Sequence, residues 1–409
     1  MTFLSSPAGS PRPERDAPEN PAVVVRSLFG GAMALAVAMG IGRFAYTPIL
    51  PAMQAATHLG TGQAGLLASS NYAGYLVGAL AITTLAPRAA RGSLLIACLV
   101  AVVITTGLMG ATTNLVAWGL IRFLSGIASA GVFILATGMV LEALRRHGRL
   151  ALSGWLYSGV GVGIALSGAI VRIAGDRLGW RGDWIGLALL AAAATGLAMR
   201  RLITPAPAPA DSTRMGTAHR EKEPEGPHMR FVLAALCGAY LLEGTGYIVT
   251  GTFLVAIVDR MPGLGAFGPS VWIVVGLAAA PSSIAWARLA SRVGYAPALV
   301  VAYAVQAAGI ALPLRGGAEA ALIAAILFGG TFIGISALTL TLADQLAPRN
   351  SARIIGLLTA AFGLGQIAGP TLAGLLAGRS NSFAPALAAA TAMVILAGML
   401  MAAAWWVAE

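Results

Sequence analysis

The chain has 409 residues, of which 58% are hydrophobic and only 10% are charged. Soluble domains carry about 25% charged residues, so this composition leaves little room for a soluble domain and indicates an integral membrane protein. The formal net charge of +11 does not point to a nucleic-acid partner, because the basic residues lie in short loops between apolar runs.

Apolar runs long enough to cross a bilayer recur twelve times, after a Pro-rich tail at residues 1–26 that is predicted to be disordered. Six runs fill residues 27–200 and six fill residues 231–409. A polar, Pro-rich linker at residues 201–230 is expected to act as a flexible hinge between them. The expected spans are 27–50, 63–86, 92–110, 115–141, 150–172, 182–200, 231–257, 269–290, 297–314, 319–343, 353–377 and 384–407.

The orientation in the membrane is predicted from the 26 lysines and arginines. With both termini on one side, 18 of these residues fall on that side and six on the other. The remaining two, Arg43 and Arg122, lie inside predicted spans. Because cytoplasmic loops are enriched in Lys and Arg, we expect both termini in the cytoplasm of a bacterial inner-membrane protein.

An internal repeat relates the two groups of six spans. The stretch at residues 40–51 places Arg43 between glycines and prolines, which can end or bend a helix. A relative of this stretch returns 204 residues later: Gly40, Gly42 and Leu50 correspond to Gly244, Gly246 and Leu254. Six spans per repeat make the copies parallel, and paired six-helix halves around a central cavity are typical of transporters.

The fourth span carries Arg122, Ser125 and Gly126 in an RxxSG pattern. This pattern and the twelve spans in two parallel sixes resemble the major facilitator superfamily. The stretch at residues 40–51 resembles more narrowly its YbfB/YjiJ group. The resemblance implies an all-α membrane fold of two six-helix bundles. It also implies secondary active transport by alternating access, commonly coupled to protons, with no enzyme activity.

The loop after the second span departs from this superfamily. The usual Gly…Asp…Gly-Arg pattern, whose Asp makes a gate contact, here keeps basic residues and the last Gly but has no Asp. Glu142, at the inner end of the fourth span, could pair with Arg88 or Arg91 instead and form the inner gate.

Arg43 is the first candidate for binding a substrate. An arginine in a membrane segment costs roughly 2.5–3.5 kcal/mol on insertion scales, so it usually has a partner or a function. Tyr46 and Thr47 follow at i+3 and i+4 and share its helix face. Arg43 either meets an anionic substrate or Glu243, or it binds backbone carbonyls and locks two helices.

Glu243 lies near the middle of the seventh span, with Tyr247 on the same face, and is interpreted as the only acidic residue well inside any span. Its carboxylate is expected within reach of Arg43, where opening and closing of the pair could load and release a proton. A permanent ion pair is the alternative. Arg122 is a second candidate for proton coupling, or a helix-locking arginine.

Further polar side chains within the spans could line the cavity, although packing or interhelical hydrogen bonds would explain each of them too. Those that we include in the substrate site are Asn71, Tyr75 and Gln366. The four histidines fall in loops without metal-ligand spacing, so no metal or cofactor is predicted.

The prediction is a proton-coupled transporter of a small organic solute, with an anionic or zwitterionic solute favoured by the two intramembrane arginines. Proton-driven efflux of cationic or lipophilic drugs is one alternative, because Glu243 could face the cavity. A non-transporting membrane sensor of the same fold is another, and a membrane enzyme would need a catalytic cluster that the sequence does not show. The expected partners are the solute, protons and the bilayer, and a monomer suffices.

Overall fold

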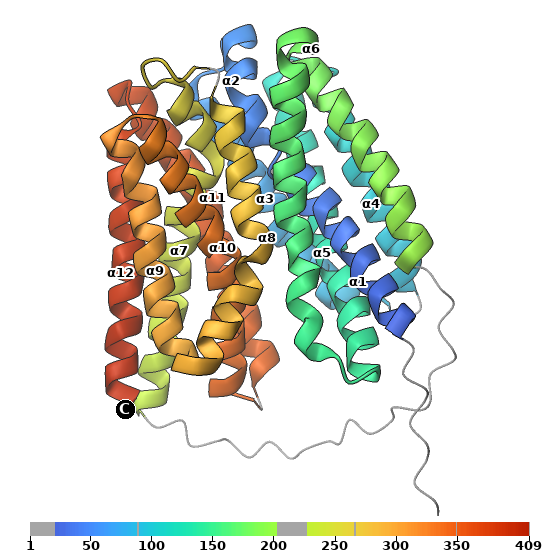
Figure 1. Cartoon of the computed structure of the whole chain (residues 1–409), viewed down its shortest axis with the longest axis vertical. Helices are drawn as coiled ribbons and strands as arrows, with labels where there is room; N and C mark the ends of the chain where they lie inside the picture. The colour runs from blue at the N-terminus through green and yellow to red at the C-terminus, as the bar shows by residue number, and fades with distance from the viewer. Residues whose placement is uncertain (1–20, 88–89, 203–226, 266, 349, 409) are drawn as a thin grey trace, which may run out of the picture.

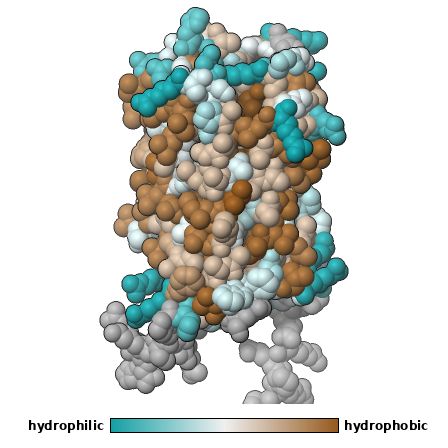
Figure 2. Space-filling view, turned by 90° about the vertical axis from the view of Figure 1, so that its left-hand side faces the viewer, coloured by the Kyte–Doolittle hydropathy of each residue, from teal (hydrophilic) through white to brown (hydrophobic). Residues whose placement is uncertain are grey.

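The computed structural model describes residues 21–87, 90–202, 227–265, 267–348 and 350–408, and all regular elements within these ranges are helical. Twelve helical segments of the described residues are long and apolar enough to cross a membrane. On the face shown in Figure 2, hydrophobic residues cover the middle of the molecule, and hydrophilic residues gather at both ends. The chain is therefore an integral, multi-pass membrane protein.

The first half contains six spans, and the first of them is built from three helical pieces. The element labelled α6 comprises two helices that meet at Gly179, where the backbone is non-helical and φ is 63°. The first belongs to the fifth span, Leu150–Gly175, and the second forms the sixth span, Arg177–Leu202. The elements of this half are α1 (Pro21–Leu35), the π-helix η1 (Ala36–Ile41), α2 (Tyr46–Thr57), α3 (Thr61–Leu85), α4 (Arg91–Leu108), α5 (Leu115–Arg146), η3 (Leu150–Ser153) and α6 (Gly154–Leu202).

The second half contains the other six spans, and all of them except the ninth are formed by one helix. Its elements are α7 (Pro227–Asp259), α8 (Gly268–Val293), α9 (Tyr295–Ala311) with the short η4 (Leu312–Arg315), α10 (Ala318–Leu346), α11 (Ser351–Ser380) and α12 (Ala384–Ala408). The two halves stand side by side (Figure 1). They meet where α3 packs on α11, α6 on α8 and α2 on α7. The start of α1 and the end of α12 lie at the same end of the molecule, called here the terminal end (Figure 1).

The predicted twelve spans are confirmed, with shifts at their ends. The first helix begins at Pro21, so residues 21–26 of the predicted tail are helical, and α7 begins at Pro227, four residues before the predicted span. Residues 1–20 of the tail and residues 203–226 of the predicted linker lie outside the described part of the chain.

The regular helix of the first span is interrupted at residues 42–45, three residues before Pro48. Pro48 has no N–H to donate to the carbonyl of Phe44, which accepts from Thr47 N at 3.2 Å instead. On the other side, Gly42 N donates to Val37 O at 2.8 Å in the wider π-helical pattern. Arg43 therefore lies on a short, irregular stretch of turns between η1 and α2, while Pro51 lies inside α2.

Gly40 lets the interrupted span approach the fifth span closely. A Cβ added at Gly40 would lie 2.4 Å from the Cα of Gly163 on α6, closer than any real side chain allows. The backbone on which Arg43 sits is thereby held against α6, inside the first half.

Candidate functional site

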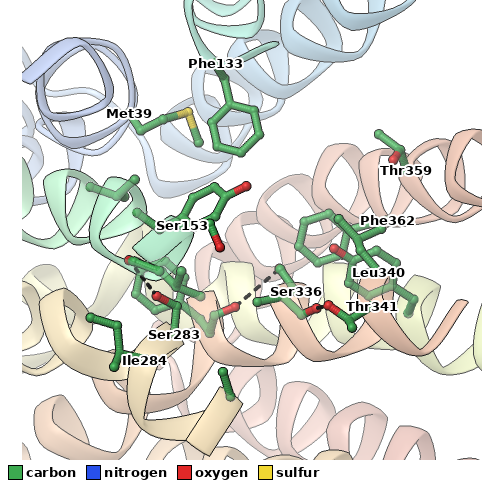
Figure 3. Close-up of a pocket in the computed structure, with 18 of the residues that line it drawn as sticks. Met39, Phe133, Ser153, Ser283, Ile284, Ser336, Leu340, Thr341, Thr359 and Phe362 are labelled. Atoms are coloured by element: carbon green, nitrogen blue, oxygen red, sulfur yellow. Dashed lines mark hydrogen bonds between the residues drawn. The ribbon is translucent and has the colours of Figure 1, made fainter. Parts of the chain in front are cut away.

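A cavity of about 940 Å³ lies between the two halves. Met39 and Phe133 from the first half and Phe362 and Leu340 from the second half surround it in Figure 3. Its walls include residues near the helix ends at the terminal end, and its deepest residues lie at the middle of the spans. The cavity thus extends inward from the terminal end.

Contacts between the halves close the other end of the molecule. Thr47 Oγ1 donates to Gly251 O at 2.6 Å, and these two residues are separated by the repeat offset of 204. Ser69 Oγ donates to Ile367 O at 2.6 Å. Because Ile367 directly follows the cavity residue Gln366, this closure begins just beyond the deepest part of the cavity.

Arg43 lies in the cavity wall with 3% of its surface exposed. Its Nη2 donates to Gln366 Oε1 at 2.8 Å, across the boundary between the halves. The guanidinium carbon is 4.5 Å from the ring centre of Tyr72 and 4.3 Å from that of Tyr75, a cation–π arrangement. Arg43 Nε has no hydrogen-bond partner among the described residues.

Gln366 connects Arg43 to Tyr247, the position that corresponds to Arg43 in the repeat. Its Nε2 donates to the Tyr247 hydroxyl while its Oε1 accepts from Arg43. The Tyr247 ring stacks on that of Phe362, with centroids 5.4 Å apart and planes inclined by 11°. Four predicted substrate residues, Arg43, Tyr75, Tyr247 and Gln366, are therefore gathered in one wall of the cavity.

The other three predicted substrate residues do not line this cavity. Tyr46 donates its hydroxyl to Ala64 O at 3.0 Å, and Thr47 belongs to the closed end. Asn71 Nδ2 donates to Arg122 O at 2.9 Å, so it joins α3 to α5. Their polar groups are used for contacts between helices.

Arg122 is 1% exposed and donates to the backbone at the interruption of the first span. Its Nη1 and Nη2 lie 3.3 Å from the carbonyl oxygens of Gly42 and Arg43, and its guanidinium stacks over the ring of Tyr46 at 4.8 Å. Ser125, one turn further along α5, also donates to Gly42 O at 3.2 Å. This geometry matches the helix-locking interpretation of Arg122.

Glu243 is 1% exposed and does not line the cavity. Its Oε1 accepts from Gln306 Nε2 on α9 at 2.6 Å, and it forms no salt bridge with Arg43. Its Oε2 and Gln306 Oε1 have no partner among the described residues. The expected approach of Glu243 and Arg43 is thus replaced by two separate pairs, each of one ionisable group and one neutral amide. Gln306 was not among the predicted site residues. The sequence feature that could have indicated it is its position as a glutamine inside an apolar span.

A second acidic side chain is buried besides Glu243, near the end of a span and not well inside it. Asp183, in the sixth span, is completely buried. It lies beyond the kink at Gly179, close to Gly175 on the fifth span. The kink folds the ends of these two spans together and covers a carboxylate that hydropathy alone places near a membrane surface.

The predicted inner gate is not assembled in the described residues. Glu142 pairs with Arg146 at 2.5 Å, one turn along α5, and both side chains are about half exposed. Arg91 begins α4 and forms no salt bridge within the described residues, and Arg88 lies outside them. An exposed i, i+4 pair of this kind contributes about 0.3–0.5 kcal/mol, so it can open easily.

The fold is shared with solved transporters. A nucleoside transporter, NupG, aligns with a TM-score of 0.69 and 13% identity over 95% of this chain and 99% of its own, and a point mutant of the same transporter aligns equally well. A bacterial homologue of the human lysosomal transporter Spinster, in an inward-facing and occupied conformation, aligns with a TM-score of 0.64 and 15% identity, over 96% and 97% of the two chains. At these identities the likeness shows the fold alone.

The family itself is shown by sequence. No curated protein matches the chain. The model of a family described as "Uncharacterised MFS-type transporter YbfB" matches residues 35–402, which cover both halves and nearly all of the twelve spans. The resemblance seen in residues 40–51 is thereby confirmed, and the chain belongs to this family of MFS-type transporters.

Proposed function

We propose that this transporter moves a small organic anion or zwitterion across the bacterial cytoplasmic membrane by alternating access, driven by protons. Residues 27–200 and 231–409 would act as the two moving bundles, and the linker at 201–230 as the hinge. With both termini in the cytoplasm, as the distribution of Lys and Arg favours, the cavity faces the cytoplasm in this structure.

The observation that carries the proposed substrate charge is the environment of Arg43. Arg43 is a buried cation, and no carboxylate of the described residues lies within salt-bridge distance of it. Burying an unpaired charge costs several kcal/mol, and an anionic group of a substrate would compensate it. No acidic side chain lines the cavity within the described residues, so drug-type efflux of cations has less support.

The test is a thermal-shift screen of the purified protein against organic acids, amino acids, sugars and lipophilic cations. A ligand at about 100 times its dissociation constant should stabilise the fold by roughly 2.7 kcal/mol. We expect hits among the anions that disappear in Arg43→Gln and persist in a matched control, Arg379→Gln, which changes an exposed arginine outside the cavity. Hits among cations that survive Arg43→Gln would refute the assignment.

We assign the proton to Glu243. In its neutral form, the carboxyl would donate from Oε2 to Gln306 Oε1 while Oε1 keeps the bond from Nε2, and this single proton would satisfy both unpartnered oxygens. The titratable groups that face Glu243 are Tyr240, Tyr247 and Tyr303, and no basic side chain of the described residues forms a salt bridge with it. Arg122, with its donors on backbone carbonyls, is not needed for this step.

Reconstituted Glu243→Gln separates proton coupling from transport. An amide pair with Gln306 can still form, so we expect the fold and the exchange of substrate for substrate to persist. Accumulation driven by a pH gradient should be lost. Unchanged proton-driven accumulation would exclude this carboxyl as the proton carrier, whereas a wild-type protein without any counterflow would indicate a non-transporting sensor.

A further inference from the structure

The guanidinium carbon of Arg43 lies over the rings of Tyr72 and Tyr75, and one edge of the group has an unused donor. Nε and Nη2 form one edge of a guanidinium, the fork that accepts a carboxylate with two parallel hydrogen bonds. Here Nη2 is bound to Gln366 Oε1 and Nε has no partner among the described residues. An amide oxygen thus fills one position of a fork that a carboxylate would fill completely.

Beside this fork the second half presents a row of nearly parallel rings. Tyr240 stacks on Phe362 at 4.3 Å and 16°, Phe362 on Tyr247 at 5.4 Å and 11°, and Tyr247 on Phe332 at 6.1 Å and 12°. All four rings line the cavity, and we call them the ring wall. Because Gln366 bonds both Arg43 and Tyr247, the ring wall adjoins the fork.

Part of the remaining wall has hydroxyl donors that are already used within the protein. Five hydroxyl side chains of the lining donate their hydrogen to backbone carbonyls of helices: Ser283, Ser291, Ser336, Thr341 and Thr359. Apart from Arg43, the charged lining residue of the described part is Arg288, which is exposed at the terminal end. A second carboxylate held beside the ring wall would therefore lose water without meeting a second buried cation among the described lining residues.

We infer that the substrate is a monocarboxylate with a flat aromatic body. Its carboxylate replaces the Gln366 oxygen on the Nε–Nη2 edge of Arg43, and its ring packs against the ring wall. A cavity of about 940 Å³ leaves ample room for one or two fused rings. This inference rests on the proposed function and narrows its class of anions.

The experiment measures dissociation constants of the full-length protein by titration calorimetry. The aromatic acids are benzoate, phenylacetate and indole-3-acetate. The comparison probes are hexanoate, which lacks the ring, phenylacetamide, which lacks the charge, phthalate, which adds a second charge, and adenosine. We expect an aromatic acid to bind about three- to tenfold more tightly than hexanoate, the factor that an aromatic contact contributes. Phenylacetamide, phthalate and adenosine should bind at least tenfold more weakly.

Two variants of neighbouring phenylalanines test the ring wall directly. Phe332→Leu should weaken the best aromatic acid about three- to tenfold and leave hexanoate within about twofold. Phe328→Leu is the matched control, because Phe328 stacks on Phe332 at 5.4 Å but does not line the cavity. Should Phe332→Leu fail to fold, Phe362→Leu removes another ring of the wall and should weaken the best aromatic acid by a similar factor, again without weakening hexanoate.

The outcomes separate this inference from the proposed function. If hexanoate binds as tightly as the aromatic acids and both are lost in Arg43→Gln, the ring preference is wrong while anion transport stands. If phenylacetamide or adenosine binds and the acids do not, both fall. Failure of all three aromatic acids to bind overturns the inference as well.

Discussion

Replacing Gly65 by alanine should shift the protein away from the form with its cavity open at the terminal end. Gly65 on α3 faces α11 of the other half, and a Cβ there would lie 2.2 Å from Pro370 O. Ordinary contacts begin at 3.4 Å, so the two backbones must separate by about 1 Å at the closed end. Overpacking of this kind costs typically 1–3 kcal/mol, which changes the equilibrium between two forms about 5- to 150-fold.

A cysteine at position 47 reports this change. Thr47 is 2% exposed and bonds Gly251 at a different contact between the halves, so its exposure requires that whole end to open. Cys98 and Cys237, the two native cysteines, are replaced by alanine in this background. With alkylation slower than reclosing, the labelling rate of Thr47→Cys follows the population of the opened form and should rise 5- to 150-fold with Gly65→Ala.

The matched control lies three residues earlier on the same helix. A Cβ at Gly62 would lie 3.6 Å from Leu375 Cδ2, an ordinary contact with the end of a side chain. Gly62→Ala should therefore leave the labelling rate unchanged. If Gly65→Ala is folded and labelled no faster than Gly62→Ala, the contact of α3 with α11 does not hold the closed end, and the reasoning from two rigid halves is refuted.

Two further predictions concern the contacts that hold the interrupted span and the closed end. Arg122→Leu removes the donors to the carbonyls of Gly42 and Arg43 and should lower stability by about 1–3 kcal/mol, measured as an earlier unfolding midpoint. If the Arg122→Leu protein keeps its stability but loses transport, Arg122 has a functional role and is not a helix-locking residue alone. Ser69→Ala removes two hydrogen bonds to α11 and should raise Thr47→Cys labelling about two- to tenfold, and an unaltered rate would show that these bonds contribute nothing to closure.

The sequence predicts the fold well because a helix must contain a long apolar segment to cross a bilayer, and such segments can be read directly from the hydropathy of the sequence. Prolines locate the interruption of the first span, because Pro48 lacks the donor that would continue the helix. The repeat offset also pairs Thr47 with Gly251 and Arg43 with Tyr247, and the first pair meets directly in the structure. What the repeat cannot reveal is which of the matched positions touch.

The pairing of the charged groups could not be predicted, because it depends on how each helix is rotated about its own axis. Hydropathy is nearly the same all around these helices, so it does not define which face meets which neighbour. Gln366 reaches Arg43 from 323 positions away, and Gln306 reaches Glu243 from another helix. Opposite charges suggested a direct pair, but neutral amides partner both groups.

This separation has a consequence for how a proton and a substrate would be coupled. Glu243 and Tyr247 lie one turn apart on α7, with Gln306 bound to the first and Gln366 to the second. A carboxylate arriving at Arg43 would displace Gln366 and release the bond that joins the halves there. The freed Gln366 and Tyr247 would be able to shift, and with them the turn of α7 that carries Glu243. In this arrangement Arg43 and Glu243 would be coupled through one helical turn and two side-chain amides, and neither side chain has to approach the other.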